Sequence, residues 1–157
     1  MRRQDREITD INVINDIIKN SPFMSVAMNT DNKSAPYIVT LNHAYDIIDG
    51  NIILYFHCAS KGYKNELLKK NPNVAVTIVD SHGLLATPKG EDYSWNYRSV
   101  FGIGTCNEVF DEEKKVALDM LLIQNGYEGE LSYPEKILNV TTVYKIELNK
   151  YTAKGNI

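Results

Sequence analysis

The sequence predicts a mainly β protein, an antiparallel closed or half-closed barrel with helices at its periphery. β-branched and aromatic residues gather in about six or seven short runs that turn residues separate. Only three segments have helical periodicity, whereas a doubly wound parallel sheet needs a helix after nearly every strand. The chain has 157 residues, 43% of them hydrophobic, and we expect one domain over residues 1–157.

The first half of the chain predicts one helix and a series of strands. The helix covers residues 9–21, where Thr9 or Asp10 can cap it. Its apolar face consists of isoleucines at three- and four-residue spacing: Ile11, Ile14, Ile17 and Ile18. Next we expect a strand over 23–29, a polar turn over 30–36, and β-rich runs over 37–48 and 51–59 that form a hairpin around Asp49-Gly50-Asn51.

The second half predicts two helices between further strands. In order, we expect a short helix over 63–71, a strand over 73–80, a loop over 81–94, a strand over 95–110, a helix over 111–127, a loop containing Pro134 and a strand over 141–154. Gly102 and Gly104 indicate a bulge or a close backbone approach within their strand. The apolar face of the 111–127 helix should comprise Val116, Leu118, Leu121 and Leu122, and Asn125-Gly126 should close the helix.

Composition and charge exclude several function classes. Seventeen basic and 20 acidic residues give a net charge of −3, which is no footprint for nucleic acid. The sequence shows neither a signal peptide nor an apolar run long enough to span a membrane. Two cysteines, Cys58 and Cys106, cannot form a disulfide framework, and reduced thiols indicate a cytoplasmic protein. The three histidines, His43, His57 and His82, show no metal-binding spacing, so we expect no metal site.

One strand-to-helix join, within "YFHCASKGYKNELLKKNP" at residues 55–72, concentrates hydrogen-bond donors. The helix should start between Ser60 and Gly62, so that its first amides point over the turn. Gly62 lets the backbone approach a ligand closely, and Lys61 and Lys64 lie one turn apart. The pattern predicts a bound anionic group. The alternative is a surface helix whose lysines are solvated, as we expect for the following lysine pair at 69–70.

Five segments together resemble a known family. They are "RRQDREITD" at the start, "PYIVTLN" at 36–42, "LYFHCASKGYKNELLKKNPNV" at 54–74, "YRSVFGIGT" at 97–105 and "TTVYKIELNKYTAK" at 141–154. The chain resembles the flavin-binding split-barrel proteins related to pyridoxamine phosphate oxidase, and within them the nitroimidazole-resistance branch. The resemblance implies a six-stranded antiparallel split β-barrel, FMN as cofactor, a small-molecule substrate and a homodimer with the cofactor sites at the subunit interface. The chain departs from the family at Thr40, where proline is usual, and at His43-Ala44, where an aromatic-glycine pair is usual.

The resemblance also implies roles for individual residues. At the join, it favours Lys64 over Lys61 as the phosphate ligand. Val39, Thr40, Leu41 and Asn42 would run past the flavin ring as an edge, with Ile38 and Leu41 partly in the core. His57, Cys58 and Ala59 would line the cofactor, with His57 as a proton shuttle or a structural residue and Cys58 as a packing residue rather than a nucleophile. Arg98 and Ser99 are further cofactor contacts, but neighbours on a strand face opposite ways, so one of them faces away or serves a dimer partner.

The leading functional hypothesis is an FMN-dependent oxidoreductase that reduces a small nitroaromatic compound such as a 5-nitroimidazole. Pyridoxamine phosphate oxidase activity itself is not expected, because the chain stops at "YTAKGNI" without that branch's longer C-terminal segment. One alternative is a non-catalytic flavin-binding module or redox sensor. Another is a split barrel that binds haem through His43, His57 or His82.

Overall fold

The computed structural model describes residues 3–31 and 35–156. Its helices are η1 (Gln4–Arg6), α1 (Ile11–Asn20), α2 (Tyr63–Lys70), η2 (Gly90–Asp92), α3 (Asp111–Gln124) and α4 (Glu135–Val140). Its strands are β1 (Glu7–Ile8), β2 (Phe23–Met28), β3 (Tyr37–Asn42), β4 (Ala44–Ile48), β5 (Asn51–Ala59), β6 (Asn73–Leu85), β7 (Ser94–Val109) and β8 (Thr141–Gly155). The described residues thus form eight strands instead of the expected six. Two causes are the two-residue β1 and the division of the 37–48 run at His43.

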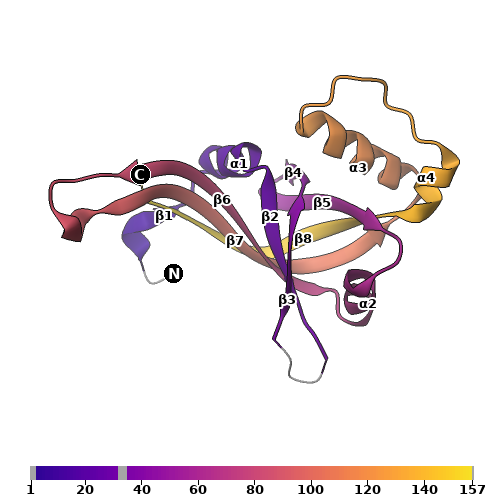
Figure 1. The fold of residues 1–157 in the computed structure, drawn as a ribbon, viewed down its shortest axis with the longest axis horizontal. Helices are drawn as coiled ribbons and strands as arrows, with labels where there is room; N and C mark the ends of the chain where they lie inside the picture. Colours follow the sequence, from indigo (N-terminus) through magenta and orange to yellow (C-terminus); the bar gives the residue numbers. More distant parts are fainter. Residues whose placement is uncertain (1–2, 32–34, 157) are drawn as a thin grey trace.

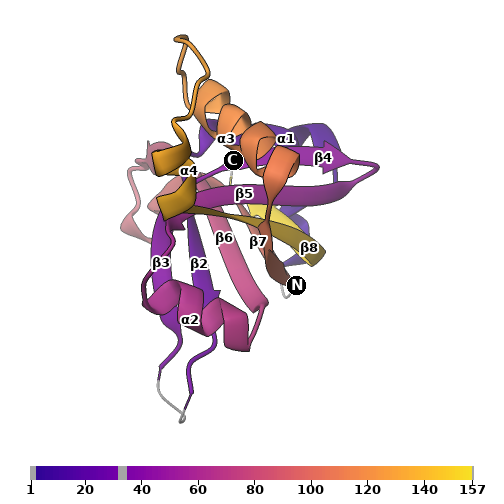
Figure 2. The ribbon, with the colours of Figure 1, turned by 90° about the vertical axis from the view of Figure 1, so that its right-hand side faces the viewer.

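The strands form one antiparallel sheet in the order β3-β2-β6-β7-β8-β5-β4, and β1 pairs with β8. Its two edge strands, β3 and β4, follow each other directly in the chain through His43. The sheet therefore curls until its two ends meet at one corner, and Figure 2 shows β2 and β3 running across the direction of β4 and β5. This arrangement confirms the predicted mainly β, half-closed barrel.

Several local predictions from the sequence are confirmed. The Asp10 side chain caps α1 by accepting a hydrogen bond from the Asn12 amide at 2.9 Å. Asp49 and Gly50 both have positive φ, as the tight β4–β5 hairpin requires. The β7–β8 register shifts at Gly104, and a Cβ on this glycine would lie 2.1 Å from the Glu147 carbonyl oxygen. Only glycine allows the two strands to approach so closely at this bulge.

Other local predictions were wrong. Residues 81–94 are not all loop, because β6 continues to Leu85 and β7 begins at Ser94, with a register shift at Ser81/Gly83 that keeps the two strands paired. The loop containing Pro134 holds α4, which follows directly from that proline. On α3, Val116 is exposed and Ala117 takes its place in the buried face. Residues 32–34 of the predicted polar turn lie outside the described residues.

The buried side chains form two clusters. The larger fills the inside of the sheet beneath α1, and the smaller lies where α3 packs against β4, β5 and β8. Figure 1 shows α1 over the middle of the sheet, α3 and α4 at one end and the long β6–β7 hairpin reaching out at the other. In the described segments, no helix is long and apolar enough to cross a bilayer.

Candidate functional site

The turn between β5 and α2 is built around Gly62. This residue has φ 144° and ψ 167°, a conformation open almost only to glycine, and its carbonyl accepts hydrogen bonds from the amides of Asn65 and Glu66 at 3.1 and 3.3 Å. The helix therefore begins at Tyr63, just after the predicted Ser60–Gly62 start, with Gly62 as its capping residue. The backbone N–H groups of Tyr63 and Lys64 have no intrahelical acceptor, since the first turn of any helix leaves them free. These amides form an anion-binding end.

The ammonium groups of Lys61 and Lys64 form no ion pair with the described part of the chain. Lys64 is half-buried, and its Nζ lies 5.8 Å from the centroid of the Phe56 ring, over the end of β5. Lys61 is exposed. Neither ammonium has a hydrogen-bond or ion-pair partner within 3–31 and 35–156, whereas Lys70, at the other end of α2, pairs with Asp31 at 2.6 Å. Lys64 is thus the cation that the fold places beside the free amides without an acid to neutralise it.

β5 delivers three predicted site residues to the same place. His57 and Ala59 are exposed, while Cys58 is half-buried and packs against the main core. Partial loss of hydration lowers the pKa of the His57 imidazole below 6.5, and the nearby Lys64 ammonium lowers it further. The ring is therefore mainly neutral at pH 7. Burial raises the pKa of Cys58, although Lys64 and Asn65 act in the opposite direction. A protonated thiol of this kind fits a packing role and not that of a nucleophile.

β3 runs beside this turn as an edge strand. In the described part of the chain it pairs with β2 alone, which leaves alternate backbone groups of Val39 to Asn42 open along its other edge. Val39 and Leu41 pack against the core and Thr40 is exposed. Ile38 is 63% exposed, so the expectation that it lies partly in the core was wrong. Tyr37 contacts Tyr63 edge-to-face at 5.1 Å between ring centroids, which brings the start of α2 against the start of β3.

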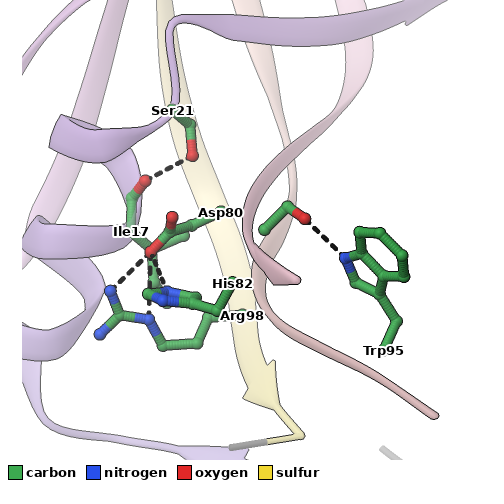
Figure 3. Close-up of polar contacts among 7 residues, drawn as sticks. Ile17, Ser21, Asp80, His82, Trp95 and Arg98 are labelled. Atoms are coloured by element: carbon green, nitrogen blue, oxygen red, sulfur yellow. Dashed lines mark hydrogen bonds and ion pairs between the residues drawn. The ribbon is translucent and has the colours of Figure 1, made fainter. Parts of the chain in front are cut away.

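Arg98 and Ser99 lie elsewhere in the chain's own fold. Arg98 pairs with Asp80, seven residues along β6 from Asn73, or roughly 23 Å from the strand start that follows α2. The Asp80 Oδ2 accepts hydrogen bonds from Arg98 Nη2 at 2.5 Å and from His82 Nε2 at 2.8 Å (Figure 3). Ser99 faces the opposite side of the sheet and is buried. One chain therefore does not bring either residue to the β5–α2 turn.

The Asp80 carboxylate is paired with Arg98 and His82 of its own chain. Burial alone would raise the pKa of Asp80, but the hydrogen bonds from Arg98 and His82 outweigh it and hold the pKa below its usual value. The Arg98 guanidinium is consequently occupied by an acid of its own chain, and the arrangement is that of a buried ion pair.

His43 is buried at the corner between β3 and β4, with 5% of its surface exposed. The Asn125 side chain donates a hydrogen bond to its backbone carbonyl at 3.0 Å, so the end of α3 covers this corner. Nδ1 of His43 is buried without a hydrogen-bond partner among the described residues, and burial lowers the pKa of the ring. His43 is thus largely buried, at the bottom of a hollow between the end of α1 and the end of α3.

Asn65 is a site residue that the sequence reasoning missed. Its side chain is buried, donates to the Ala59 carbonyl at 3.0 Å and accepts from the Tyr144 hydroxyl at 2.8 Å. A signal existed in the sequence, since Asn65 is a poor helix former placed two residues before the first buried leucine of α2. Its partner Tyr144 lies on β8, about 80 residues away in the sequence, so no local pattern predicts that contact.

The family comparison agrees with this geometry. A family model described as pyridoxamine 5'-phosphate oxidase matches residues 10–155. The chain belongs to this family. The match covers α1 and every strand from β2 to β8. A comparison with curated proteins found no significant match.

Solved structures of similar fold include several with stated ligands or roles. A candidate 5-nitroimidazole antibiotic resistance protein from Bacteroides thetaiotaomicron is 29% identical, with 95% of this chain and 86% of that chain covered and a TM-score of 0.78. An FAD- and haem-binding protein from Mycobacterium smegmatis is 18% identical, with 96% and 73% covered and a TM-score of 0.79. The flavocytochrome Anf3 from Azotobacter vinelandii is 19% identical, with 100% and 72% covered and a TM-score of 0.78. The last two similarities concern the fold alone.

Proposed function

We propose that this member of the pyridoxamine 5'-phosphate oxidase family is an FMN-dependent oxidoreductase that reduces a small nitroaromatic compound such as a 5-nitroimidazole. The observation that supports it best is the half-buried, unpaired Lys64 ammonium beside a glycine-capped helix start. An FMN phosphate needs several N–H donors and a cation, and this turn offers both. The similarity to the Bacteroides thetaiotaomicron protein supports the nitroaromatic substrate.

The residues present fit an FMN molecule. Among the described residues, and leaving out the chain neighbours of Gly62, the nearest atom to its Cβ position is Asn65 Nδ2 at 4.0 Å, so the turn is open to a ligand. Lys64, with Lys61 as the second possibility, and the amides of Tyr63 and Lys64 would hold the phosphate. The free edge of β3 from Val39 to Asn42 would donate and accept hydrogen bonds along the polar rim of the ring. FMN, when bound, supplies the electron transfer to the nitro group.

The protein's own residues would orient the cofactor, place a positive charge beside its phosphate and accept a proton near its ring. No acid among residues 3–31 and 35–156 pairs with the Lys64 ammonium, so it is available to the phosphate. His57, neutral at pH 7 and exposed beside Lys64, can accept a proton or donate a hydrogen bond near the ring. The packed Cys58 beneath it excludes water from the inner side of the strand.

We also propose that two copies form a homodimer with the cofactor at their interface. An apolar face of β6 and β7 supports this arrangement, because Val79, Phe101 and Ile103 point to the same side of the sheet and are each at least 44% exposed. Ser99 lies on that face and would reach the interface. A cytoplasmic location is proposed as well, since both cysteines are free thiols.

The absorption spectrum of the purified protein tests the proposal first. Peaks in the near ultraviolet and the blue would show a bound flavin, and a single sharp Soret band would favour the haem alternative. In that case His57 is the leading axial ligand, because His82 bonds Asp80 and His43 is buried. Reduction of a 5-nitroimidazole faster than free FMN under the same reductant separates an enzyme from a flavin-binding module or redox sensor. Sedimentation equilibrium tests the dimer.

A further inference from the structure

Both polar atoms of the Asn65 side chain form hydrogen bonds inside the protein. Nδ2 donates to the carbonyl of Ala59 at 3.0 Å, and Oδ1 accepts from the Tyr144 hydroxyl at 2.8 Å and from the Cys58 thiol at 3.6 Å. The residue is 5% exposed. A buried amide bonded through both its nitrogen and its oxygen favours one arrangement of its neighbours, because movement would break hydrogen bonds that water cannot easily replace.

The bonds of Asn65 join the two sides of the turn. Ala59 is the last residue of β5, and Asn65 lies in the first turn of α2, with its own amide donating to Gly62 at 3.1 Å. One residue therefore connects the end of the strand, the glycine cap and the start of the helix. The direction in which the Tyr63 and Lys64 amides point depends on this connection.

A second set of contacts places the Lys64 ammonium. Phe56 and Tyr144 stack with their ring centroids 5.2 Å apart, and Lys64 Nζ lies over Phe56. Because Tyr144 also donates to Asn65, the ring stack beneath Lys64 and the helix start are linked through one hydrogen bond. An asparagine is also neutral. An aspartate here would put a carboxylate beside Lys64 and cancel the charge that the anion requires.

We propose that Asn65 is a positioning residue for an anionic phosphate at this turn: it sets the direction of the helix amides and of Lys64 without touching the ligand. The inference rests on the proposed function, since the phosphate is that of FMN. It adds a determinant of phosphate recognition that lies beneath the binding surface.

Fluorescence titration with FMN and with riboflavin, which has the same ring but no phosphate, tests the proposal. The wild type should bind FMN more tightly than riboflavin. Asn65→Leu should lower FMN affinity by about tenfold, the lower end of what loss of a hydrogen-bond partner behind a metal ligand costs in metal affinity, and should leave riboflavin affinity unchanged. Asn65→Asp should lower FMN affinity further, because it also adds a negative charge.

Tyr144→Phe keeps the ring stack and removes only the hydroxyl donor, so it serves if the Asn65 variants do not fold. It should reduce the preference for FMN by a few-fold, consistent with about 1 kcal/mol for one hydrogen bond. Tyr151→Phe is the matched control, because its hydroxyl bonds the Gly50 carbonyl at the distant β4–β5 hairpin. It should change neither affinity.

An unchanged ratio of FMN to riboflavin affinity in Asn65→Leu and Tyr144→Phe would overturn the inference. Equal losses for the two flavins would also overturn it, because they would show a general structural role. A wild type that binds both flavins equally, or neither, would instead contradict the phosphate site of the proposed function.

Discussion

The lysine at the β5–α2 turn and the arginine of the β6–β7 hairpin differ in whether an acidic side chain pairs with them. Lys64 lies beside free helix amides and has no acidic partner among the described residues, whereas Arg98 donates two hydrogen bonds to the buried Asp80. In the sequence, both look alike: a cation next to small and hydroxyl residues. The structure separates them by the presence of an internal counterion. A cation with its own acid stabilises the fold, and a cation without one is available to a ligand.

The largest effect should come from breaking the paired region. Asp80→Asn leaves the largely buried Arg98 guanidinium without its counterion, and we expect a loss of about 3 kcal/mol in the free energy of unfolding. FMN affinity should not change, because the pair lies far from the turn within one chain. Urea denaturation and FMN titration of the same preparation measure the two quantities. Weaker FMN binding by a folded Asp80→Asn protein would place Arg98 at the cofactor, most simply that of a dimer partner.

The converse experiment removes the unpaired charge. Lys64→Ala should weaken FMN binding severalfold to a hundredfold, since a charge-assisted hydrogen bond is worth roughly 1.5–3 kcal/mol, and should leave the urea midpoint unchanged. Lys61→Ala tests the second lysine of the turn, for which a smaller loss is expected because its side chain is exposed. Lys69→Ala, an exposed lysine at the end of the same helix, is the control. Equal FMN affinities for Lys64→Ala and Lys69→Ala would rule out Lys64 as the phosphate ligand.

A substitution at Gly62 should reduce both the stability of the fold and the affinity for FMN. Gly62→Ala forces a side chain into a backbone conformation that costs about 1–3 kcal/mol, so stability should fall and FMN binding should weaken with it. Gly50→Ala, at a positive-φ hairpin turn remote from α2, should reduce stability alone. Thermal unfolding with and without FMN measures both variants. If the two glycine variants behave alike, with FMN stabilising each as much as the wild type, the turn at Gly62 is not part of the binding site.

Much of the fold could be predicted from the sequence because its signals are local. Turn residues at Asp49-Gly50 and the cap at Asp10 each depend on a few neighbouring residues. Gly104 indicates a close backbone approach from its own residue type, although its partner Glu147 is distant in the sequence. The extension of β6 to Leu85 could not be predicted, since Gly, Pro and charged residues look like a loop until a partner strand is present. Register with β7 outweighs their low β propensity.

The candidate site divides in the same way. The turn residues from Ser60 to Lys64 are contiguous, so their spacing suggests an anion site, which the family resemblance favours over a solvated surface helix. The partner of Arg98 is an acid 18 residues away, and Tyr144, the partner of Asn65, is 79 residues away. Such pairings depend on strand order, which a single sequence does not specify. For this reason the sequence predicted a cofactor role for Arg98 and did not single out Asn65.

The dependence of folding stability on pH should distinguish Asp80, the paired carboxylate, from His43, the buried imidazole at the β3–β4 corner. We expect this to be the smallest of the effects. The pKa of Asp80 is lowered in the fold, so its stabilisation is present above an unfolded pKa of 3.8 and is lost as pH falls through the folded value. The pKa of His43 is lowered from 6.5, so the unfolded chain takes up protons first and stability declines as pH falls below 6.5. His57 acts in the same window.

His43→Phe removes the buried ring nitrogen that has no partner, and should therefore reduce the decline in melting temperature below pH 6.5. It should leave the drop near and below pH 4 intact, and the double variant with His57→Gln should flatten the upper window further. Melting temperatures from pH 8 to pH 3 measure both steps. A pH profile of His43→Phe identical to that of the wild type would mean that the corner opens to water before its histidine is protonated.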